Sequence, residues 1–579
     1  MTWRLKEKLQ TTLAGEQGAK VYAPGSRDGF SLVYPNTYHV GMSNLGMHII
    51  YQQINGRGDT ACERLFMPDK KTELEYRRTN TPLMTIETQR SLYEFPLIGF
   101  AVSFEMDYFN ILSILSLGKV PLFASERTEQ EPLLIAGGPC ATFNPEPLAD
   151  FFDIFILGEG EEVIHEILDS YYRSRARNAS REQILQDMAA IEGVYVPRFY
   201  QPVYSPEGIL TEILQRGEKA GKLNRRWIKN LDQYPGETVV LTHETEFKDM
   251  YLVEVARGCG RHCRFCMAGY CFRRPRIRSL ALIKEAIGRA KQYQKKVGLM
   301  GAAISDYPDI DELCRFIDLQ DIGLSVASLR ADSLTKALVA ALANSGQRTI
   351  TLAPEAGSEK LRKIINKGIT EEHLSSSVSQ AIAAGIPHIR LYFMIGLPFE
   401  TDDDIKAIID LAVTTKKQME RLGSKGKLTL SINPFIPKPF TPFQWLPMCR
   451  SDVVEARLHL IQTTLKPLKN VEVIAESLKE AYIQGVLARG DRRLGRVLFS
   501  AQQQGGSKAF HKAMKKYQLS ENDYLYRWDG STETVLPWQH LSMGFDMDYL
   551  RQELIKAKNQ KFTAPCVSGC TRCGICKVE

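Results

Sequence analysis

Short apolar runs of strand length alternate with amphipathic stretches over the first third of the chain. The apolar runs lie at 29–35, 97–105, 132–139 and 153–158. Stretches with the three- and four-residue apolar spacing of a helix include 42–53, 107–118 and 160–173. This alternation predicts an α/β fold in which residues 1–215 form a doubly wound domain with a mostly parallel sheet.

A second series of apolar runs begins after residues 216–247, a charged and irregular stretch that we interpret as a linker. The candidate strands are 251–256, 297–304, 323–328, 348–353, 388–398 and 427–435. The candidate helices are 280–295, 309–318, 332–345, 358–366, 371–384 and 402–421. Six successive βα units predict a parallel barrel, full or partial, over residues 248–450.

The last part of the chain has a less regular pattern. Four prolines predict a loop at 436–449. Residues 451–560 are predicted to form a C-terminal helical or mixed domain, with mainly helical character at its start. The chain then ends in a cysteine-rich tail at 561–579.

Composition places the chain among ordinary soluble globular proteins. Its 579 residues are 44% hydrophobic and 24% charged, which is enough for several cores. The net charge of +7 permits an anionic substrate or RNA without requiring either. We expect a cytoplasmic location and no membrane association, because the first residues are polar and no run of about 20 apolar residues occurs.

Seven of the twelve cysteines fall into two tight groups. The first group is Cys259, Cys263 and Cys266, and the second is Cys566, Cys570, Cys573 and Cys576. In a cytosolic chain such groups indicate metal sites rather than disulfides. The scattered cysteines, which we expect to be buried apolar side chains, are Cys62, Cys140, Cys314 and Cys449. Cys271 lies close to the first group and is ambiguous.

The first group has the spacing Cys-x3-Cys-x2-Cys and follows the first barrel strand, where barrel active sites lie. Three thiolates hold three irons of a [4Fe–4S] cluster and leave the fourth iron open to a substrate. A zinc knuckle or three unrelated thiols are the alternatives. Zinc is disfavoured because His262, between Arg261 and Cys263, is poorly placed as a fourth ligand.

Seven arginines surround this loop, at positions 257, 261, 264, 273, 274, 276 and 278. Such a positive field favours an anionic cluster and a carboxylate ligand, although a solvated surface is the ordinary alternative. The arginines do not establish an RNA substrate.

The segment CGRHCRFC (259–266), with Phe265 before its last cysteine, resembles the signature of the radical S-adenosylmethionine (SAM) superfamily. The resemblance implies that Cys259, Cys263 and Cys266 are the catalytic residues and that SAM chelates the open iron. It also implies that an electron from the reduced cluster cleaves a C–S bond of SAM to give a 5′-deoxyadenosyl radical.

The resemblance continues through the barrel and implies where SAM would bind. VGLMGAAISD (297–306) resembles the SAM-amine loop, although the usual Gly-Gly-Glu is here Gly301-Ala302-Ala303. TLAPEAGSEKLRKIINKG (351–368) and MIGLPFET (394–401) resemble the fourth- and fifth-strand segments of the family. The implied SAM contacts are Phe265, Gly301, Ala302, Glu355 and Gly396. For the barrel segments, tight turns or core packing are the alternatives.

AGGPCATFNPEPLADFFDIFILGEGEE (136–162) resembles the cobalamin-binding domain that precedes the barrel in many radical SAM proteins. Cys140 replaces the histidine of the usual Gly-Gly-Pro-His-Ala-Thr, and the Asp-x-His-x-x-Gly motif is absent. His39 is a weak candidate for a cobalt ligand, since a loop histidine is the ordinary interpretation. The domain therefore either binds cobalamin or serves as a lid or substrate platform.

The tail segment CVSGCTRCGIC (566–576) places four thiols within eleven residues. This compact spacing resembles ferredoxin ligation, whereas four-cysteine zinc sites usually consist of two distant pairs. A second [4Fe–4S] cluster is favoured, with zinc or a redox-active or disordered tail as alternatives. Such a cluster could transfer electrons to the first, bind substrate or donate sulfur.

The whole layout resembles a largely uncharacterised family of cobalamin-domain radical SAM proteins with a cysteine tail. The favoured function is cobalamin-linked methyl transfer, or rearrangement, on an unidentified substrate. A methylthiotransferase-like modification of tRNA or protein is the second hypothesis, although the three-cysteine cluster of that family's N-terminal domain is missing. A non-catalytic iron–sulfur carrier is the third, and the complete barrel argues against it. We expect a reductase, flavodoxin or ferredoxin as electron donor.

Overall fold

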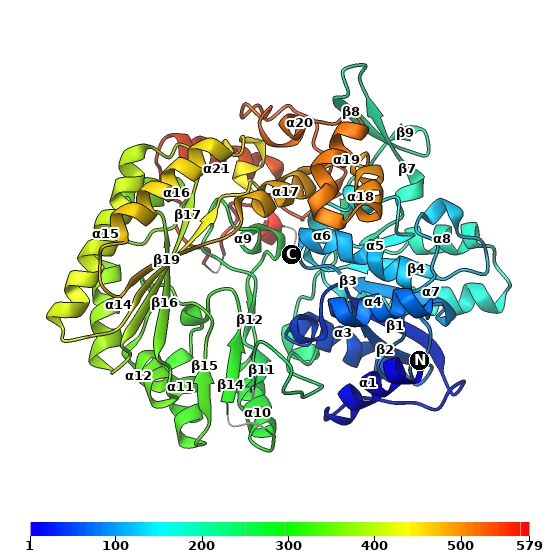
Figure 1. Cartoon of the computed structure of the whole chain (residues 1–579), viewed down its shortest axis with the longest axis horizontal. Helices are drawn as coiled ribbons and strands as arrows, with labels where there is room; N and C mark the ends of the chain where they lie inside the picture. The colour runs from blue at the N-terminus through cyan, green and yellow to red at the C-terminus, as the bar shows by residue number, and fades with distance from the viewer. Residues whose placement is uncertain (1, 249, 294–295, 568, 578–579) are drawn as a thin grey trace. The chain divides into compact units, whose positions relative to one another are not determined.

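The computed structural model describes residues 2–248, 250–293, 296–567 and 569–577. The chain forms two compact units, which Figure 1 shows coloured along the sequence. Unit 1 comprises Met1–Asp249, Val486–Glu521 and Glu533–Gly544, and unit 2 comprises Met250–Gly485, Asn522–Thr532 and Phe545–Glu579. The stretch 451–560, which the sequence predicts as one domain, is therefore divided between the units, and the expected linker 216–247 belongs to unit 1.

Unit 1 is built on a six-stranded sheet with the order β2-β1-β3-β4-β5-β6. Its strands are β1 (Asp28–Tyr34), β2 (Thr60–Phe66), β3 (Leu97–Ala101), β4 (Leu133–Gly137), β5 (Ile154–Ile156) and β6 (Val194–Tyr195). The first five are parallel and β6 is antiparallel to β5. The main helices are α3 (Leu45–Asn55), α4 (Lys70–Thr79), α5 (Tyr108–Leu117) and α7 (Gly160–Ala176). The doubly wound fold is confirmed, and its strand order reverses between β1 and β3.

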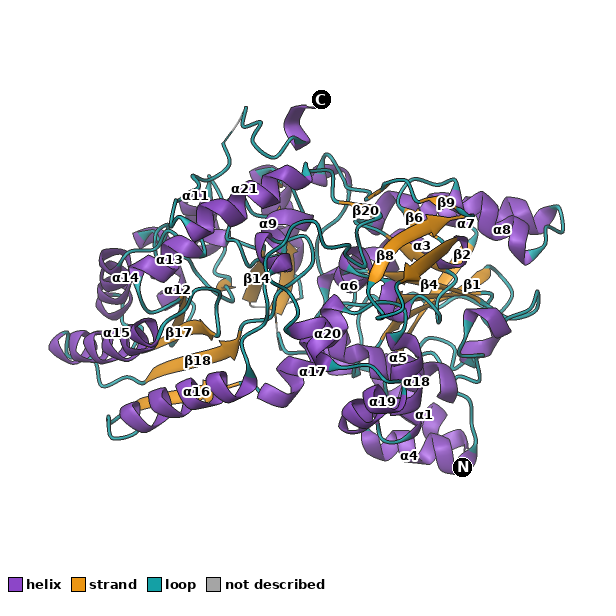
Figure 2. Ribbon diagram, turned by 90° about the horizontal axis from the view of Figure 1, so that it is seen from above, coloured by secondary structure: helices purple, strands orange, loops and turns teal. Residues whose placement is uncertain are grey.

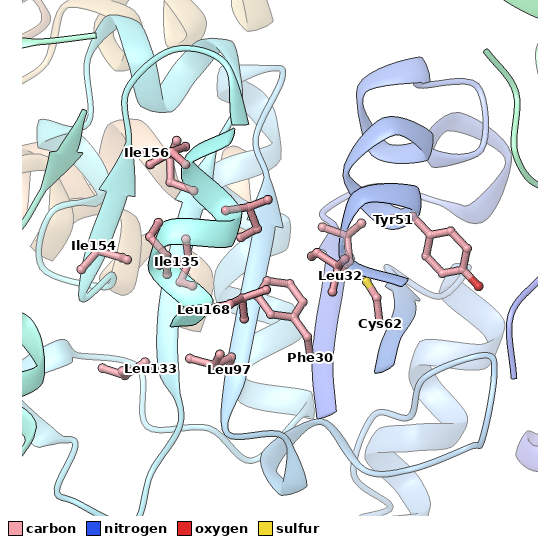
Figure 3. Packing of buried hydrophobic residues seen from close by; sticks show 14 of the residues in the cluster. Phe30, Leu32, Tyr51, Cys62, Leu97, Leu133, Ile135, Ile154, Ile156 and Leu168 are labelled. Carbon is pink, nitrogen blue, oxygen red and sulfur yellow. The ribbon is translucent and has the colours of Figure 1, made fainter. Parts of the chain in front are cut away.

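The core of unit 1 lies between one face of this sheet and helices α3 and α7. Figure 3 shows neighbouring strands contributing Phe30, Leu97 and Leu133 to it, with Leu168 from α7 and Tyr51 from α3. Each of these side chains is less than one tenth exposed. Burial of an apolar side chain of this size stabilises a fold by about 1.5–3 kcal/mol, so this layer holds the helices on the sheet.

A later part of the chain completes unit 1. Helices α18 (Leu494–Gln503) and α19 (Phe510–Lys516) belong to it, and β10 (Leu223–Asn224) pairs with β20 (Leu541–Ser542). Buried Glu146 accepts hydrogen bonds from Tyr195 and from Arg492, whose Nε lies 3.1 Å from the carboxylate. The ARGDRRLG segment (488–495) therefore joins the C-terminal stretch to the N-terminal sheet.

The barrel of unit 2 is built from two parallel sheets with helices around the outside of the strands (Figures 1 and 2). The first sheet contains β11 (Met250–Glu254), β14 (Lys296–Met300) and β15 (Gly323–Ser325). The second contains β16 (Thr349–Glu355), β17 (His388–Ile395), β18 (Leu428–Pro434) and β19 (Val471–Ala475). A bridge between Leu329 and Leu352 connects the two sheets. All six predicted barrel strands are present, and β19 is an additional one.

The helices of unit 2 follow the strands in the βα order that the sequence predicts. They are α10 (Leu280–Ala290), α11 (Ile310–Leu319), α12 (Lys336–Asn344), α13 (Glu359–Ile364), α14 (Glu371–Ala383), α15 (Asp402–Arg421) and α16 (Ser451–Leu465). Residues 294–295 of the predicted first helix lie outside the described residues. No described helix has both the length and the apolar character needed to cross a membrane.

Side chains alternate between buried and half-buried along β16 and β17. Since successive side chains of a strand point to opposite faces, one face packs against the helices and the other lines the barrel interior. Leu391 and Phe393 belong to the buried set, whereas Tyr392 and Met394 belong to the half-buried one. The half-buried side chains that line the barrel interior are therefore accessible to a ligand.

Candidate active site

The first cysteine group lies on a closed loop at the carboxyl end of β11. Strand β12 (Ala256–Arg257) pairs with β13 (Arg276–Ile277) and closes the base of this loop. Gly258 adopts a φ of +81°, and a Cβ there would lie 2.2 Å from the carbonyl oxygen of Phe272. Only glycine fits this position, so Gly258 fixes the turn that leads into Cys259.

The three thiols of this loop influence one another. Burial raises the pKa of Cys266 to about 12, and the neighbouring Cys263 and Cys259 act in the same direction. Burial and Cys263 likewise raise the pKa of Cys259. No group of three or more histidine, cysteine or acidic side chains has the geometry of a formed metal site within the described ranges. Three adjacent cysteines on one loop nevertheless fit a cationic iron cluster, which would bind them as thiolates.

A buried arginine lies beside the loop. Arg330 Nη1 is 4.0 Å from Cys263 Sγ, and its Nη2 donates to the Lys367 carbonyl at 2.8 Å. Asp332 holds the same guanidinium with a bond of 2.9 Å and also pairs with Arg261. The Arg330 guanidinium is therefore held beside the Cys263 sulfur by Asp332 and by the Lys367 carbonyl.

Most of the arginines around the loop are structural rather than solvated. Arg264, Arg273, Arg276 and Arg278 are all less than one tenth exposed. Arg264 Nη1 donates to the carbonyls of Lys363 and Ile364 at the end of α13, at 3.0 and 2.7 Å. The arginines therefore brace the loop in addition to making its surroundings positive.

A cavity of about 550 Å³ opens at the carboxyl ends of the second sheet. Its walls include Phe265 from the cysteine loop, Glu355 from β16, and Tyr392 and Asn433 from β17 and β18. This volume is within the range of pockets that enclose small ligands. Glu355 is held by Lys367, whose Nζ donates to its Oε1 at 3.0 Å. Two of the predicted SAM contacts, Phe265 and Glu355, therefore face one cavity.

The other predicted SAM contacts are not among the described residues that line this cavity. Gly301 and Ala302 are exposed after the end of β14. Gly396 has a φ of +77°, its N–H donates to Glu400 Oε2 at 2.7 Å, and a Cβ there would lie 2.9 Å from Cys449 Cβ. This geometry supports a tight turn at Gly396 as its main role.

The second cysteine group lies beside the first. The N–H of Cys566 donates to the carbonyl of Gly260 at 2.8 Å, which attaches the tail to the cysteine loop. Burial raises the pKa of Cys566, and Cys570 adds to this effect. Burial opposes ionisation of Cys570 as well, but the Arg572 guanidinium, 3.2 Å from its sulfur, holds the pKa of Cys570 below its usual value. Cys573 is buried and Cys576 is half-buried.

Unit 1 places polar side chains at its strand-order reversal. Asn36, after β1, donates to Asp107 Oδ1 at 2.7 Å, and Asn44 donates to Ser103 Oγ at 3.3 Å, after β3. Burial raises the pKa of Asp107 to about 7. In doubly wound folds, ligands bind at this edge of the sheet.

His39, the weak candidate for a cobalt ligand, and Cys140, which stands in place of the motif histidine, also belong to unit 1. Cys140 is buried in α6 (Pro139–Phe143), where its N–H donates to the Val102 carbonyl at 3.1 Å. His39, in α2 (Tyr38–Gly41), is half exposed and its Nε2 lies 3.3 Å from Glu246. These positions favour a core cysteine and an ordinary surface histidine.

Comparisons with known proteins agree on the class of both units. A family model described as radical SAM proteins, N-terminal, matches residues 46–197, and the radical SAM superfamily model matches residues 253–412. An uncharacterised protein of Methanocaldococcus jannaschii is 30% identical over 474 residues, which cover 81% of this chain and 90% of that protein.

Two further comparisons concern parts of the chain or its fold. A tRNA-2-methylthio-N6-dimethylallyladenosine synthase of Natranaerobius thermophilus is 23% identical over 222 residues, or 36% of this chain and 48% of that enzyme. The structure of the radical SAM methyltransferase TsrM from Kitasatospora setae, with cobalamin and a [4Fe–4S] cluster bound, superposes with a TM-score of 0.52. It is 14% identical, and the match covers 85% of this chain and 99% of that chain, so the likeness is one of fold.

Proposed function

The chain belongs to the radical SAM superfamily, and from this premise we propose that Cys259, Cys263 and Cys266 hold a [4Fe–4S] cluster at which SAM is reductively cleaved. The observation that supports this most directly is the placement of three interacting thiols on one loop, with Phe265 of the same loop facing the barrel cavity. A cluster held by three thiolates keeps one iron open for a ligand.

When bound, the cluster supplies the electron and SAM supplies the radical that starts the reaction. The chain's residues bind and orient these groups. Arg330 and Arg261, which Asp306 and Asp332 hold in place, would supply hydrogen-bond donors to the cluster sulfurs and to the SAM carboxylate. The rings of Phe265, Tyr392 and Phe435 make part of the cavity wall aromatic, and the Lys367–Glu355 pair would offer a polar contact to SAM.

We further propose that unit 1 binds cobalamin and that the reaction is a methyl transfer to an unidentified substrate. The likeness in fold to TsrM and the polar edge between β1 and β3 support a ligand at this sheet. Because Cys140 is buried in α6 and His39 pairs with Glu246, cobalamin would bind without a cobalt ligand from either residue.

The products formed from SAM test this function. The protein would be reconstituted with iron and sulfide, reduced without oxygen, and supplied with SAM in the presence or absence of cobalamin. With cobalamin we expect 5′-deoxyadenosine, S-adenosylhomocysteine and methylcobalamin, and without it 5′-deoxyadenosine alone. Identical products under both conditions would refute the role of cobalamin, and intact SAM under both would refute the cleavage reaction.

A methylthiotransferase-like reaction is the second candidate, favoured by the similarity of 36% of the chain to the tRNA-modifying synthase. The same experiment separates the two reactions. S-Adenosylhomocysteine that forms equally well without cobalamin would favour methylthiolation of tRNA or protein over cobalamin-linked methyl transfer.

We also propose that Cys566, Cys570, Cys573 and Cys576 hold a second iron–sulfur cluster. Their compact spacing and the interaction of Cys566 with Cys570 support this site. Replacement of the buried Cys573 by alanine is expected to lower iron from about eight atoms per chain to about four, since each such cluster holds four irons. Elemental analysis measures this, and Cys314→Ala, a buried cysteine of α11, is the control.

Unchanged iron in the Cys573→Ala protein would contradict the second cluster. Loss of about one zinc per chain with unchanged iron would assign the site to zinc instead.

A further inference from the structure

The loop that carries the first cysteine group and the tail that carries the second share one buried side chain. Asn366, after α13, is 1% exposed. Its Nδ2 donates to the carbonyls of Arg261 and His262 on the loop, both at 3.2 Å, and to the carbonyl of Thr563 on the tail at 3.0 Å. Its Oδ1 accepts from the Thr563 N–H at 2.7 Å. One amide group thus connects both segments.

Only asparagine matches both demands of this position. The side chain must donate hydrogen bonds to backbone carbonyls and also accept one from the Thr563 N–H. An ionised aspartate cannot donate, so it does not fit. The backbone has a φ of +57°, in the left-handed region that asparagine and glycine adopt more readily than other residues. Because the amide is buried, each unsatisfied partner would lose a hydrogen bond without replacement by water.

A backbone hydrogen bond joins the two segments that carry the cysteine groups. Cys566, a proposed ligand of the tail site, donates from its N–H to the carbonyl of Gly260 at 2.8 Å. Gly260 follows Cys259, a proposed ligand of the loop site. One hydrogen bond and two peptide units therefore separate a ligand of one site from a ligand of the other.

A helix at the base of the tail contacts the same loop. Tyr549, on α21 (Met547–Lys558), is hydrogen-bonded to Nδ1 of the buried His262, which lies between the first two loop cysteines. Asp546, before the same helix, donates from its N–H to the Cys573 carbonyl at 3.0 Å. The tail site is thus fixed from both sides to elements that also hold the loop.

We propose that Asn366 is a positioning residue that couples the tail cysteine site to the catalytic cysteine site, so that the tail site sets the reduction potential of the catalytic cluster. The inference rests on the two clusters of the proposed function. A cluster with four thiolates is anionic, and a nearby negative charge disfavours the addition of an electron to a second cluster. Net charge, hydrogen bonding and solvent exposure are the properties that set such potentials.

The sign of the effect follows from this arrangement. Removing the tail cluster takes away negative charge and exposes the loop to water, and both changes favour the reduced, more negative state of the catalytic cluster. Its reduction potential therefore rises. Weakening the attachment at Asn366 moves the tail charge away from the catalytic cluster, so it also raises the reduction potential of that cluster. Loss of the tail cluster should then raise the potential by a smaller amount.

A double-mutant cycle tests the coupling in the full chain. The variants are Asn366→Gly, which keeps the left-handed backbone, Cys573→Ala, and both together. The measurement is the potential of the catalytic cluster from a redox titration followed by electron paramagnetic resonance. That cluster is recognised by the change of its spectrum on addition of SAM, since only an open iron binds it. Asn470→Gly is the matched control, because Asn470 has a φ of +58° but is exposed.

We expect Cys573→Ala to raise the potential in the wild-type background, and to raise it less than half as much in the Asn366→Gly background. Two changes that act independently would instead add. Asn470→Gly should leave the effect of Cys573→Ala unchanged. If Asn366→Gly does not fold, as judged by circular dichroism, Asn366→Ser takes its place, since its hydroxyl retains part of the contacts.

The coupling would be overturned if Cys573→Ala raised the reduction potential equally in the wild-type and Asn366→Gly backgrounds. This comparison requires that both parent proteins contain the full iron of two clusters. The coupling would also be overturned if Cys573→Ala removes four irons without any change in potential. If Cys573→Ala leaves iron unchanged, the tail cluster itself is wrong, and if SAM never alters a spectrum, the catalytic site is wrong. These failures are therefore distinguishable.

Discussion

Replacement of Cys263 by alanine is expected to abolish SAM cleavage and to remove about four irons per chain, because a [4Fe–4S] cluster cannot keep its position on two thiolates. Residues that only support metal ligands cost about 10–100-fold in affinity or activity when replaced, so the loss of a ligand should exceed this range. Of the three loop cysteines, Cys263 is the best one to replace, because it is buried and lies beside Arg330. The measurements are 5′-deoxyadenosine formation and iron content.

Cys314→Ala provides the control for that experiment. Cys314 is also buried in unit 2, on α11, but its pKa is raised to about 12 by burial and by aspartates of its own helix rather than by other thiols. We expect it to keep the iron content and the activity of the wild type. Substantial SAM cleavage by Cys263→Ala, or an equal loss in Cys314→Ala, would refute the assignment of the loop as the catalytic site.

The barrel and its cysteine loop could be predicted because their signals are local. Apolar runs of strand length followed by amphipathic helices identify β11 and β14–β18, and the cysteine spacing predicts a metal site after β11. The additional strand β19 is missed because Val471–Ala475 is short and follows a long helical pattern. It forms through pairing with β18, and such a long-range contact leaves little trace in a five-residue segment.

Strand β2 is missed for a different physical reason. Its sequence TACERLF carries Glu63 and Arg64 in the middle, yet every residue of the strand is buried. Arg64 forms ion pairs with Glu16 at 2.5 Å and with Glu87 at 2.6 Å. Buried charges are compatible with a fold when they are paired and hydrogen-bonded, but their partners lie far away in sequence. A search for apolar runs therefore misses β2, because ion pairs allow its charged residues to be buried.

The support of the active site could not be predicted for the same reason. Asn366 and Glu553 contact the cysteine loop because α13 and α21, which are distant in sequence, pack beside it. The motif indicates which cysteines are the proposed ligands, whereas long-range hydrogen bonds hold their loop in place. Sequence reasoning also favoured a surface or field role for Arg264, which is fully buried.

Arg264→Met is expected to lower the free energy of unfolding of unit 2 by about 3–5 kcal/mol, the cost of breaking a buried ion pair by removal of one partner. Arg264 and Glu553 are both fully buried, with Nε and Oε2 3.2 Å apart. Arg264 Nη2 also donates to the Lys561 carbonyl at 2.7 Å, so the change detaches the start of the tail. Lys556 Nζ, 2.8 Å from Glu553, still pairs with this carboxylate in the variant. We therefore expect a destabilisation near the lower end of this range.

Denaturant unfolding measures this change, and limited proteolysis after residue 560 reports release of the tail. Arg450→Met is the control: Arg450 is 72% exposed and pairs with exposed Asp452, so its change should stay within about 0.5 kcal/mol. Adding Glu553→Gln to Arg264→Met should restore part of the stability, because no buried carboxylate then lacks its arginine. Equal stability of the Arg264→Met and Arg450→Met proteins would show that the buried pair does not hold the tail on the cysteine loop.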